Sequence, residues 1–376
     1  MLALSLNAAP KKELNILLYG RSGSGKSTLI NVFYNHIMKH EFENPRDIII
    51  PLIHGRRFEV NVDTFKDENV QLRSYGSSQT NQIRPYKLEN DEYIATFWDT
   101  PGFMDTRGEA ADAEHLIHLA DFLAKTPIHA MAFVLTDDDV VRDSSRYQEA
   151  VDGLRQLLPK SFFPNLLGIY NKFGLNGPAY QEGCRDSVSK LFDPNIFLPT
   201  YFMDGSTLFN DLSELNQNQK MNASYHWDRD RETTEQLLLE TKTDTVLNLV
   251  EVKKIQELQQ KIQEAIDEMS KLFQLVEFQN SNLKILESKK GDFSEKIQLC
   301  KAEIEQLETE RKAKIKELMG WQDELRQLAM KTHPVDAYVW YLDRLLSPLK
   351  DDFTVSKEEY VRQKQVCQDW IEIYKI

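Results

Sequence analysis

The chain has 376 residues, enough for about two or three domains, and its 46 basic and 59 acidic side chains leave a net charge of −13. This acidic balance argues against a general nucleic-acid binder. Cys184, Cys300 and Cys367 lie far apart with no C-x-x-C pair, so neither a disulfide framework nor a zinc site is predicted, and a reducing, cytoplasmic location is expected. No apolar run is long enough to span a membrane, and a membrane-surface role stays open.

The first predicted element of the fold follows a leader, residues 1–12, that lacks the basic region of a cleaved signal peptide. A strand over 14–19 leads into residues 20–27, which match G-x-x-x-x-G-K-[ST], and a helix follows. Such a turn directs backbone N–H groups and the helix dipole at one point, which predicts a triphosphate site. Lys26 is expected to bridge the outer phosphates, and Ser27 to bind Mg2+. The residues expected at the nucleotide are Gly20, Arg21, Ser22, Gly23, Ser24, Gly25, Lys26, Ser27 and Thr28.

The alternation of apolar strand-like runs with helical stretches over residues 13–209 predicts a doubly wound α/β domain with a mainly parallel sheet. Ligands of such sheets bind beyond the carboxyl ends of the strands, so chemistry is expected just after each run. The predicted strands cover residues 14–19, 58–62, 93–98, 130–135, 166–170 and 196–202.

The strand over 93–98 ends in the sequence D-T-P-G. Asp99 is placed to hold the Mg2+ shell, and the N–H of Gly102 to reach the terminal phosphate, although an ordinary Asp-Pro-Gly turn is the alternative. The polar stretch 74–81 lies between the two motifs. Thr80, with Ser78 as the second choice, is predicted to bring a further hydroxyl to Mg2+ when the terminal phosphate is present, and a solvated loop is the alternative there.

Three motifs together, GRSGSGKST, SSQT and WDTPGFMDTRG, resemble the AIG-type and septin-like GTPases, the immune-associated nucleotide-binding branch of the translation-factor class. The likeness is greatest to eukaryotic members whose second switch reads D-T-P-G-x-x-D-T-R-G, and it covers about residues 13–206. It implies the P-loop GTPase fold, GTP and GDP as ligands, Mg2+, and two switch loops. Members of this branch commonly dimerise across the nucleotide face, so a homodimer is also implied.

Two positions depart from the GTPase pattern. The strand over 166–170 runs into Asn171-Lys172-Phe173-Gly174, where such enzymes end in N-K-x-D and the aspartate reads guanine. The asparagine and the lysine are expected to hold the base, and Asp204 is a candidate replacement for the missing carboxylate, with a helix N-cap or turn as its alternative role.

The second departure is Phe103, which follows D-T-P-G where Ras-like enzymes carry a glutamine that orients the attacking water. Hydrolysis is therefore expected to be slow without assistance. Arg107 is the predicted catalytic arginine, acting within the chain or across a dimer, and Arg21 is a second candidate. An ion pair with a nearby acidic residue is the alternative for Arg107, and a solvent-facing position is the alternative for Arg21.

The second half of the chain is predicted to be helical. Residues 210–240 are polar and are interpreted as a linker or lid. Over 241–331 a heptad pattern predicts either one long coiled coil, hence a dimer rod, or a helical hairpin that turns near Gly291. Residues 332–376 are expected to form a small helical tail that packs on the rest of the chain or binds a partner.

The sequence predicts a Mg2+-dependent GTPase whose slow hydrolysis controls dimerisation or scaffold assembly, with the helical half binding a protein effector. Two alternatives remain. The first is a coiled-coil scaffold that nucleotide stabilises without being hydrolysed. The second is an adenine-nucleotide ATPase with a coiled-coil arm.

Overall fold

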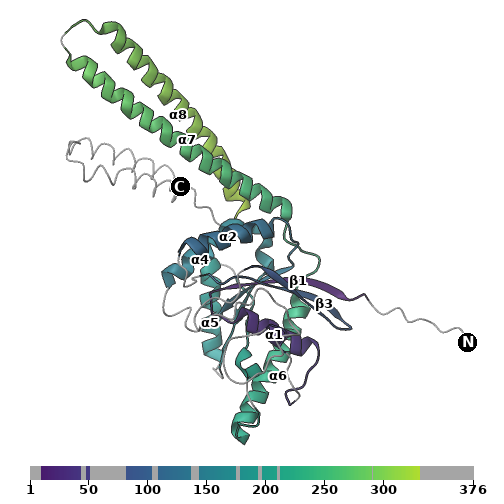
Figure 1. The fold of residues 1–376 in the computed structure, drawn as a ribbon. Coiled ribbons are helices and arrows are strands. Elements are labelled where there is room, and N and C mark those ends of the chain that lie inside the picture. The colour runs from purple at the N-terminus through teal and green to yellow at the C-terminus, as the bar shows by residue number, and fades with distance from the viewer. Residues whose placement is uncertain are drawn as a thin grey trace, which may run out of the picture. The chain divides into compact units, whose positions relative to one another are not determined.

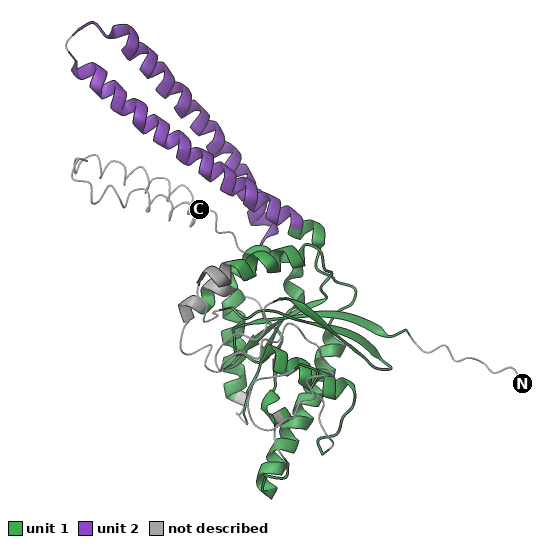
Figure 2. Ribbon diagram, viewed as in Figure 1, with its two compact units in different colours: residues 1–252 green, residues 253–376 purple. Residues whose placement is uncertain are grey.

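The protein is described here by a computed structural model that covers residues 10–43, 48–50, 82–103, 109–136, 144–174, 178–193, 197–209, 212–289 and 291–330. The chain divides into two compact units, Met1–Val252 and Lys253–Ile376 (Figure 2). The first unit holds the sheet, and the described part of the second consists of long helices (Figure 1).

Among the described residues, the first unit contains a six-stranded sheet in the order β2-β3-β1-β4-β5-β6. All neighbours are parallel except β2, which runs antiparallel to β3. This arrangement confirms the predicted doubly wound, mainly parallel α/β fold. The strands are β1 (Lys12–Gly20), β2 (Arg84–Glu89), β3 (Tyr93–Asp99), β4 (Ala130–Leu135), β5 (Leu166–Tyr170) and β6 (Thr200–Phe202).

Helices cover both faces of this sheet (Figure 1). One face packs against α1 (Lys26–Ile37) and α6 (Gln217–Glu240), which share a hydrophobic core with β1 and β3. The other packs against α2 (Glu109–Leu123), α4 (Ser144–Leu157) and α5 (Pro178–Phe192). Short 3-10 helices η2 (Lys160–Asn165) and η3 (Gly205–Phe209) precede β5 and follow β6. Because β1 and β4 are covered on both sides, they read as continuous apolar runs.

Strand β2 was not predicted from the sequence, and the predicted strand over 58–62 lies outside the described residues. The segment RPYKLE contains Pro85, which cannot donate to a ladder, and only Leu88 is fully buried. An edge strand tolerates both features, because one of its sides has no neighbouring strand to satisfy. The proline and the low burial of most of its residues explain why this strand was not predicted.

The polar stretch predicted to be a linker or lid contains helix α6, which packs against α1. A capping box of Asn216 and Gln219 begins it, with each side chain bonded to the backbone N–H of the other residue. Trp227 and Leu237 are buried on its inner face, together with the polar Asp230. Polar residues on the buried face weaken the hydrophobic periodicity, which is why the sequence was interpreted as a linker.

The described part of the second unit forms a helical hairpin rather than one long helix. α7 (Leu249–Ser288) and α8 (Ser294–Leu328) pack against each other through a shared apolar cluster that includes Ile255, Ile262 and Leu325. Gly291, at φ +143°, lies in the turn between them. Within the described ranges no helix is both long and apolar enough to cross a membrane. The predicted tail, residues 332–376, lies outside these ranges.

Candidate nucleotide-binding site

The glycine-rich loop connects the end of β1 to the start of α1 at the carboxyl edge of the sheet. Gly23 and Gly25 adopt left-handed conformations, with φ of +83° and +91°, which side chains rarely allow. Gly25 caps α1 without any side-chain hydrogen bond, and the first turn of the helix carries no acidic residue. The N-terminus of α1 therefore has the electrostatic character of an anion site.

Lys26 and Ser27 begin α1 and are held by the surrounding loops. The ammonium of Lys26 donates to the carbonyl oxygens of Gly20, at 2.9 Å, and Arg21, at 3.1 Å. The hydroxyl of Ser27 donates to Asp99 Oδ2 at 2.7 Å, although the two residues are 72 positions apart. Asp99 is only 1% exposed. The fold thus brings together the two motifs that the sequence assigned to phosphate and Mg2+ binding.

This hydroxyl–carboxylate pair has the donor chemistry that Mg2+ prefers, because both groups are hard oxygen ligands. Elsewhere in the described ranges, no cluster of three or more His, Cys, Asp or Glu side chains is arranged to hold a metal ion. Protein sites for Mg2+ commonly use one or two side chains and complete the shell with phosphate and water. Ser27 and Asp99 fit that pattern.

The segment after Asp99 lies against the glycine-rich loop. Thr100 donates its hydroxyl to the carbonyl of Leu18 at 2.7 Å, and the N–H of Ser22 donates to the carbonyl of Phe103 at 2.9 Å. A β-carbon at Gly102 would lie 2.4 Å from the backbone of Ser22, so the close approach requires glycine. The D-T-P-G segment therefore meets the glycine-rich loop backbone to backbone.

The side chain of Phe103 points into the core rather than toward this edge of the sheet. It is 4% exposed, and its ring lies 5.2 Å from the rings of Tyr19 and Tyr147 and 6.1 Å from that of Phe133, centroid to centroid. These contacts are typical of aromatic packing. Phe103, which directly follows D-T-P-G, is therefore part of the hydrophobic core.

We expect the Phe103→Gln variant to gain no hydrolytic activity and to lose about 3–5 kcal/mol of stability, the usual cost of removing a buried aromatic ring. An amide at this position would meet the rings of Tyr19 and Tyr147 instead of a water molecule. Urea unfolding would measure the loss, and phosphate release the activity. A faster release in the variant would contradict the inward orientation.

On the opposite side of the glycine-rich loop, Asn171 joins three segments. Its Nδ2 donates to the carbonyl of Ser24 at 2.9 Å, and its Oδ1 accepts from the N–H groups of Lys172, at 2.9 Å, and Gly205, at 3.2 Å. Lys172 has a left-handed φ of +58°, and its ammonium donates to the carbonyl of Gly23 at 3.2 Å. A non-glycine residue held in this region is characteristic of functional loops.

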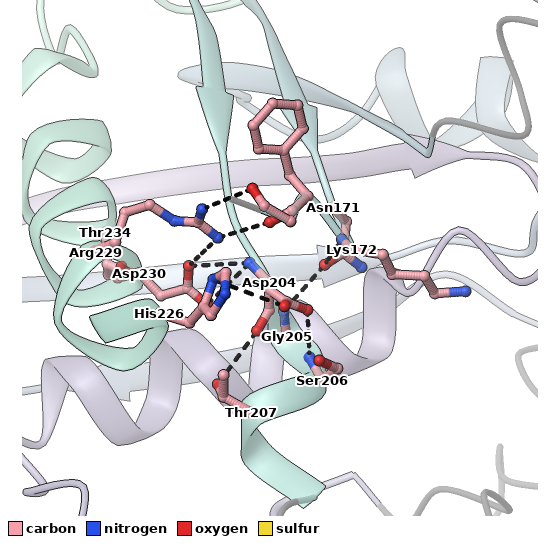
Figure 3. A network of polar contacts seen from close by, with 12 residues as sticks. Asn171, Lys172, Asp204, Gly205, Ser206, Thr207, His226, Arg229, Asp230 and Thr234 are labelled. Atoms are coloured by element: carbon pink, nitrogen blue, oxygen red, sulfur yellow. Dashed lines mark hydrogen bonds and ion pairs between the residues drawn. The ribbon is translucent and has the colours of Figure 1, made fainter. Parts of the chain in front are cut away.

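Asp204 follows β6 and begins η3. Its Oδ1 accepts from the N–H of Ser206 at 3.2 Å, and its carbonyl accepts from the hydroxyl of Thr207, also at 3.2 Å. Its Oδ2 lies 3.8 Å from Nδ1 of His226 on α6 (Figure 3). These contacts match the N-cap role that the sequence left open for it.

Helix α6 contributes side chains here that the sequence analysis did not identify (Figure 3). Arg229 donates to the carbonyls of Phe173, at 2.9 Å, and Gly174, at 3.4 Å. Asp230 is fully buried, and its two oxygens accept from the N–H of Asp204 at 3.0 and 3.1 Å. A sequence signal for these side chains did exist. Every fourth residue, His226, Asp230 and Thr234, lies on one face of the helix, next to the buried Trp227.

Burial shifts the pKa of two of these α6 groups. It raises the pKa of Asp230 to about 7, while the backbone N–H of Asp204 and the charge of Arg229 oppose the shift. It lowers the pKa of His226, an effect that Arg229 strengthens and Asp204 opposes. Both shifts favour neutral forms in a desolvated network. Thr80 and Arg107, predicted to bind Mg2+ and to assist catalysis, lie outside the described residues.

Comparison with known proteins finds a distant relative. Over 124 residues the chain is 25% identical to GTP-binding protein A of Dictyostelium discoideum. The aligned part is 33% of this chain and 20% of that protein, so the chain spans about a fifth of its relative. A third of this chain thus resembles a GTP-binding protein.

The structural comparison gives Toc33 of Arabidopsis thaliana, solved as a dimerisation-deficient mutant, at 12% identity and a TM-score of 0.38. That match covers 60% of this chain and 85% of Toc33. No family model matches the sequence.

Proposed function

We propose that this protein binds GTP with Mg2+ and hydrolyses it slowly, with the nucleotide state controlling dimerisation or scaffold assembly. The observation that carries the proposal is the 2.7 Å hydrogen bond between Ser27 and Asp99, next to a glycine-rich loop that leads into a helix with no side-chain cap. The similarity to a GTP-binding protein supports guanine as the base, as do Asn171 and Lys172 beside that loop.

Each group has a distinct role in this proposal. Lys26 neutralises the outer phosphates, and backbone N–H groups of residues 20–28 bind their oxygens. Ser27, Asp99 and Thr80 are the proposed residues that would hold Mg2+. The bound ion would stabilise the charge that develops on the transferred phosphoryl group. The N–H of Gly102 binds the terminal phosphate. Asn171 and Lys172 hold the base, and Asp204 is proposed to contribute to reading it.

The low rate follows from Phe103. Its ring is packed among Tyr19, Phe133 and Tyr147, so this position has no group that orients the attacking water. Arg107 is the proposed assisting residue, within one chain or across a homodimer formed at the nucleotide face, and Arg21 is the second candidate. The hairpin of α7 and α8 offers a surface for a protein effector, and the proposed location is the cytoplasm.

The inward orientation of Phe103 also favours a second candidate function. In it, GTP and Mg2+ bind at the same site and stabilise a scaffold, but no hydrolysis takes place. The two functions share every binding residue. They differ only in whether bound GTP is hydrolysed and phosphate is released.

Titration of labelled GTP and ATP, with and without Mg2+, tests the proposed function. We expect tighter binding of GTP than of ATP, and about tenfold weaker GTP binding when Mg2+ is removed or when Ser27 is replaced by alanine. Phosphate release per chain should rise with protein concentration if a dimer assists catalysis. A constant rate would exclude assistance across a dimer, and failure to retain either triphosphate would overturn the proposal.

A further inference from the structure

We propose that Arg229 and Asp230 of α6 are positioning residues of the nucleotide site, which clamp the two loops on its base side. The loops are residues 171–174, after β5, and residues 203–205, after β6. Neither side chain is assigned to the nucleotide itself. The inference rests on the proposed function, because its consequence is the affinity for the base of GTP.

Arg229 holds the first loop through its backbone. The Arg229 side chain is 17% exposed. Its guanidinium donates to the carbonyls of Phe173, at 2.9 Å, and Gly174, at 3.4 Å. A planar guanidinium offers donors in a fixed fork, so it can bind two successive carbonyls and set their orientation. Gly174 is the residue at which other GTPases carry the base-reading aspartate. Arg229 therefore fixes the part of the loop where base contacts are expected.

Asp230 holds the second loop. Both of its carboxyl oxygens accept from the N–H of Asp204, and Oδ1 lies 3.6 Å from the guanidinium of Arg229. The two side chains thus form one unit that contacts both loops (Figure 3). Burying such groups is costly, and replacing them with apolar residues is often neutral or stabilising. Their presence is better explained by the geometry that they impose than by a contribution to stability.

The clamp sets the position of Asn171, because this residue of the first loop forms hydrogen bonds with both the second loop and the glycine-rich loop. Its Oδ1 accepts a hydrogen bond from the N–H of Gly205 in the second loop. Its Nδ2 donates a hydrogen bond to the carbonyl of Ser24 in the glycine-rich loop. Lys26 and Ser27 are held instead by the carbonyls at 20–21 and by Asp99. Loss of the clamp should therefore disturb the base contacts and leave the phosphate contacts in place.

Arg229→Ala tests this separation of base and phosphate binding. We expect about tenfold weaker GTP binding, with unchanged affinity for inorganic tripolyphosphate, measured by its competition with labelled GTP in the presence of Mg2+. Arg231→Ala is the matched control on the same helix, because Arg231 forms its ion pairs with Asp228 and Glu41 and not with the loops after β5 and β6 in the described part of the chain. Its GTP affinity should equal that of the wild type.

A merely structural role for Arg229 would weaken GTP and tripolyphosphate binding together, and that result would overturn the inference. Unchanged GTP binding would overturn it as well. If Arg229→Ala does not fold, Arg229→Lys decides, because it keeps the charge and loses the fork, and it should show the same selective loss in smaller measure. If the wild-type chain retains no GTP, the proposed function itself fails. If the wild type binds GTP but the Arg229 variant shows no selective loss, only the present inference fails, so the two failures are distinguishable.

Discussion

Gly25→Ala is expected to weaken triphosphate binding by about 100-fold or more, equivalent to roughly 3 kcal/mol. Two effects act together. Gly25 has a φ of +91°, which alanine adopts only with strain. A β-carbon there would also lie 2.2 Å from Nδ2 of Asn171, so it would displace the amide that joins the glycine-rich loop to the base side. One methyl group thus disturbs the phosphate and base contacts at once.

Gly23→Ala is the control for the strain alone. Gly23 has a φ of +83°, but an added β-carbon has no neighbour within 4 Å. Its effect should be about tenfold or less. Labelled-nucleotide titration of both variants, with circular dichroism to verify folding, makes the comparison. Equal losses would show that contact with Asn171 is irrelevant to the site.

Gly174→Asp is expected to increase the preference for GTP over ATP by about tenfold or more, because a charge-assisted hydrogen bond contributes about 1.5–3 kcal/mol. The variant restores the carboxylate at the fourth position of N-K-x-D. The site has room for it, since a β-carbon on Gly174 has no neighbour within 4 Å. Guanine presents two donors that a carboxylate can accept, whereas adenine does not.

The matched control for Gly174→Asp is Gly183→Asp on α5, which adds the same charge at an exposed position with equally open space. It should leave the ratio of GTP to ATP affinity unchanged. Competition of the two unlabelled nucleotides against labelled GTP gives this ratio for each variant. An unchanged ratio in Gly174→Asp would mean that the base does not lie beside residue 174, and the guanine assignment would lose its main geometric support.

Features that the sequence predicted well are local or strongly apolar. The glycine-rich loop and the D-T-P-G segment are fixed by a few adjacent residues, and β1, β3, β4 and β5 are apolar runs that a buried parallel sheet requires. Strand β2 was missed because Pro85 and its partial exposure are features of an edge. For the arm, the heptad pattern did not choose between one rod and a hairpin, since both satisfy it.

By itself the sequence determined the fold class and located the glycine-rich loop and the D-T-P-G segment, because apolar periodicity and glycine-rich turns are properties of neighbouring residues. Only the tertiary structure decided how distant side chains are used. In the tertiary structure the ring of Phe103 packs in the aromatic core and Ser27 bonds to Asp99. Arg229 and Asp230, from a polar stretch, contact the loops after β5 and β6. These outcomes depend on which surfaces pack together, and burial and hydrogen-bond satisfaction across the whole unit set that choice.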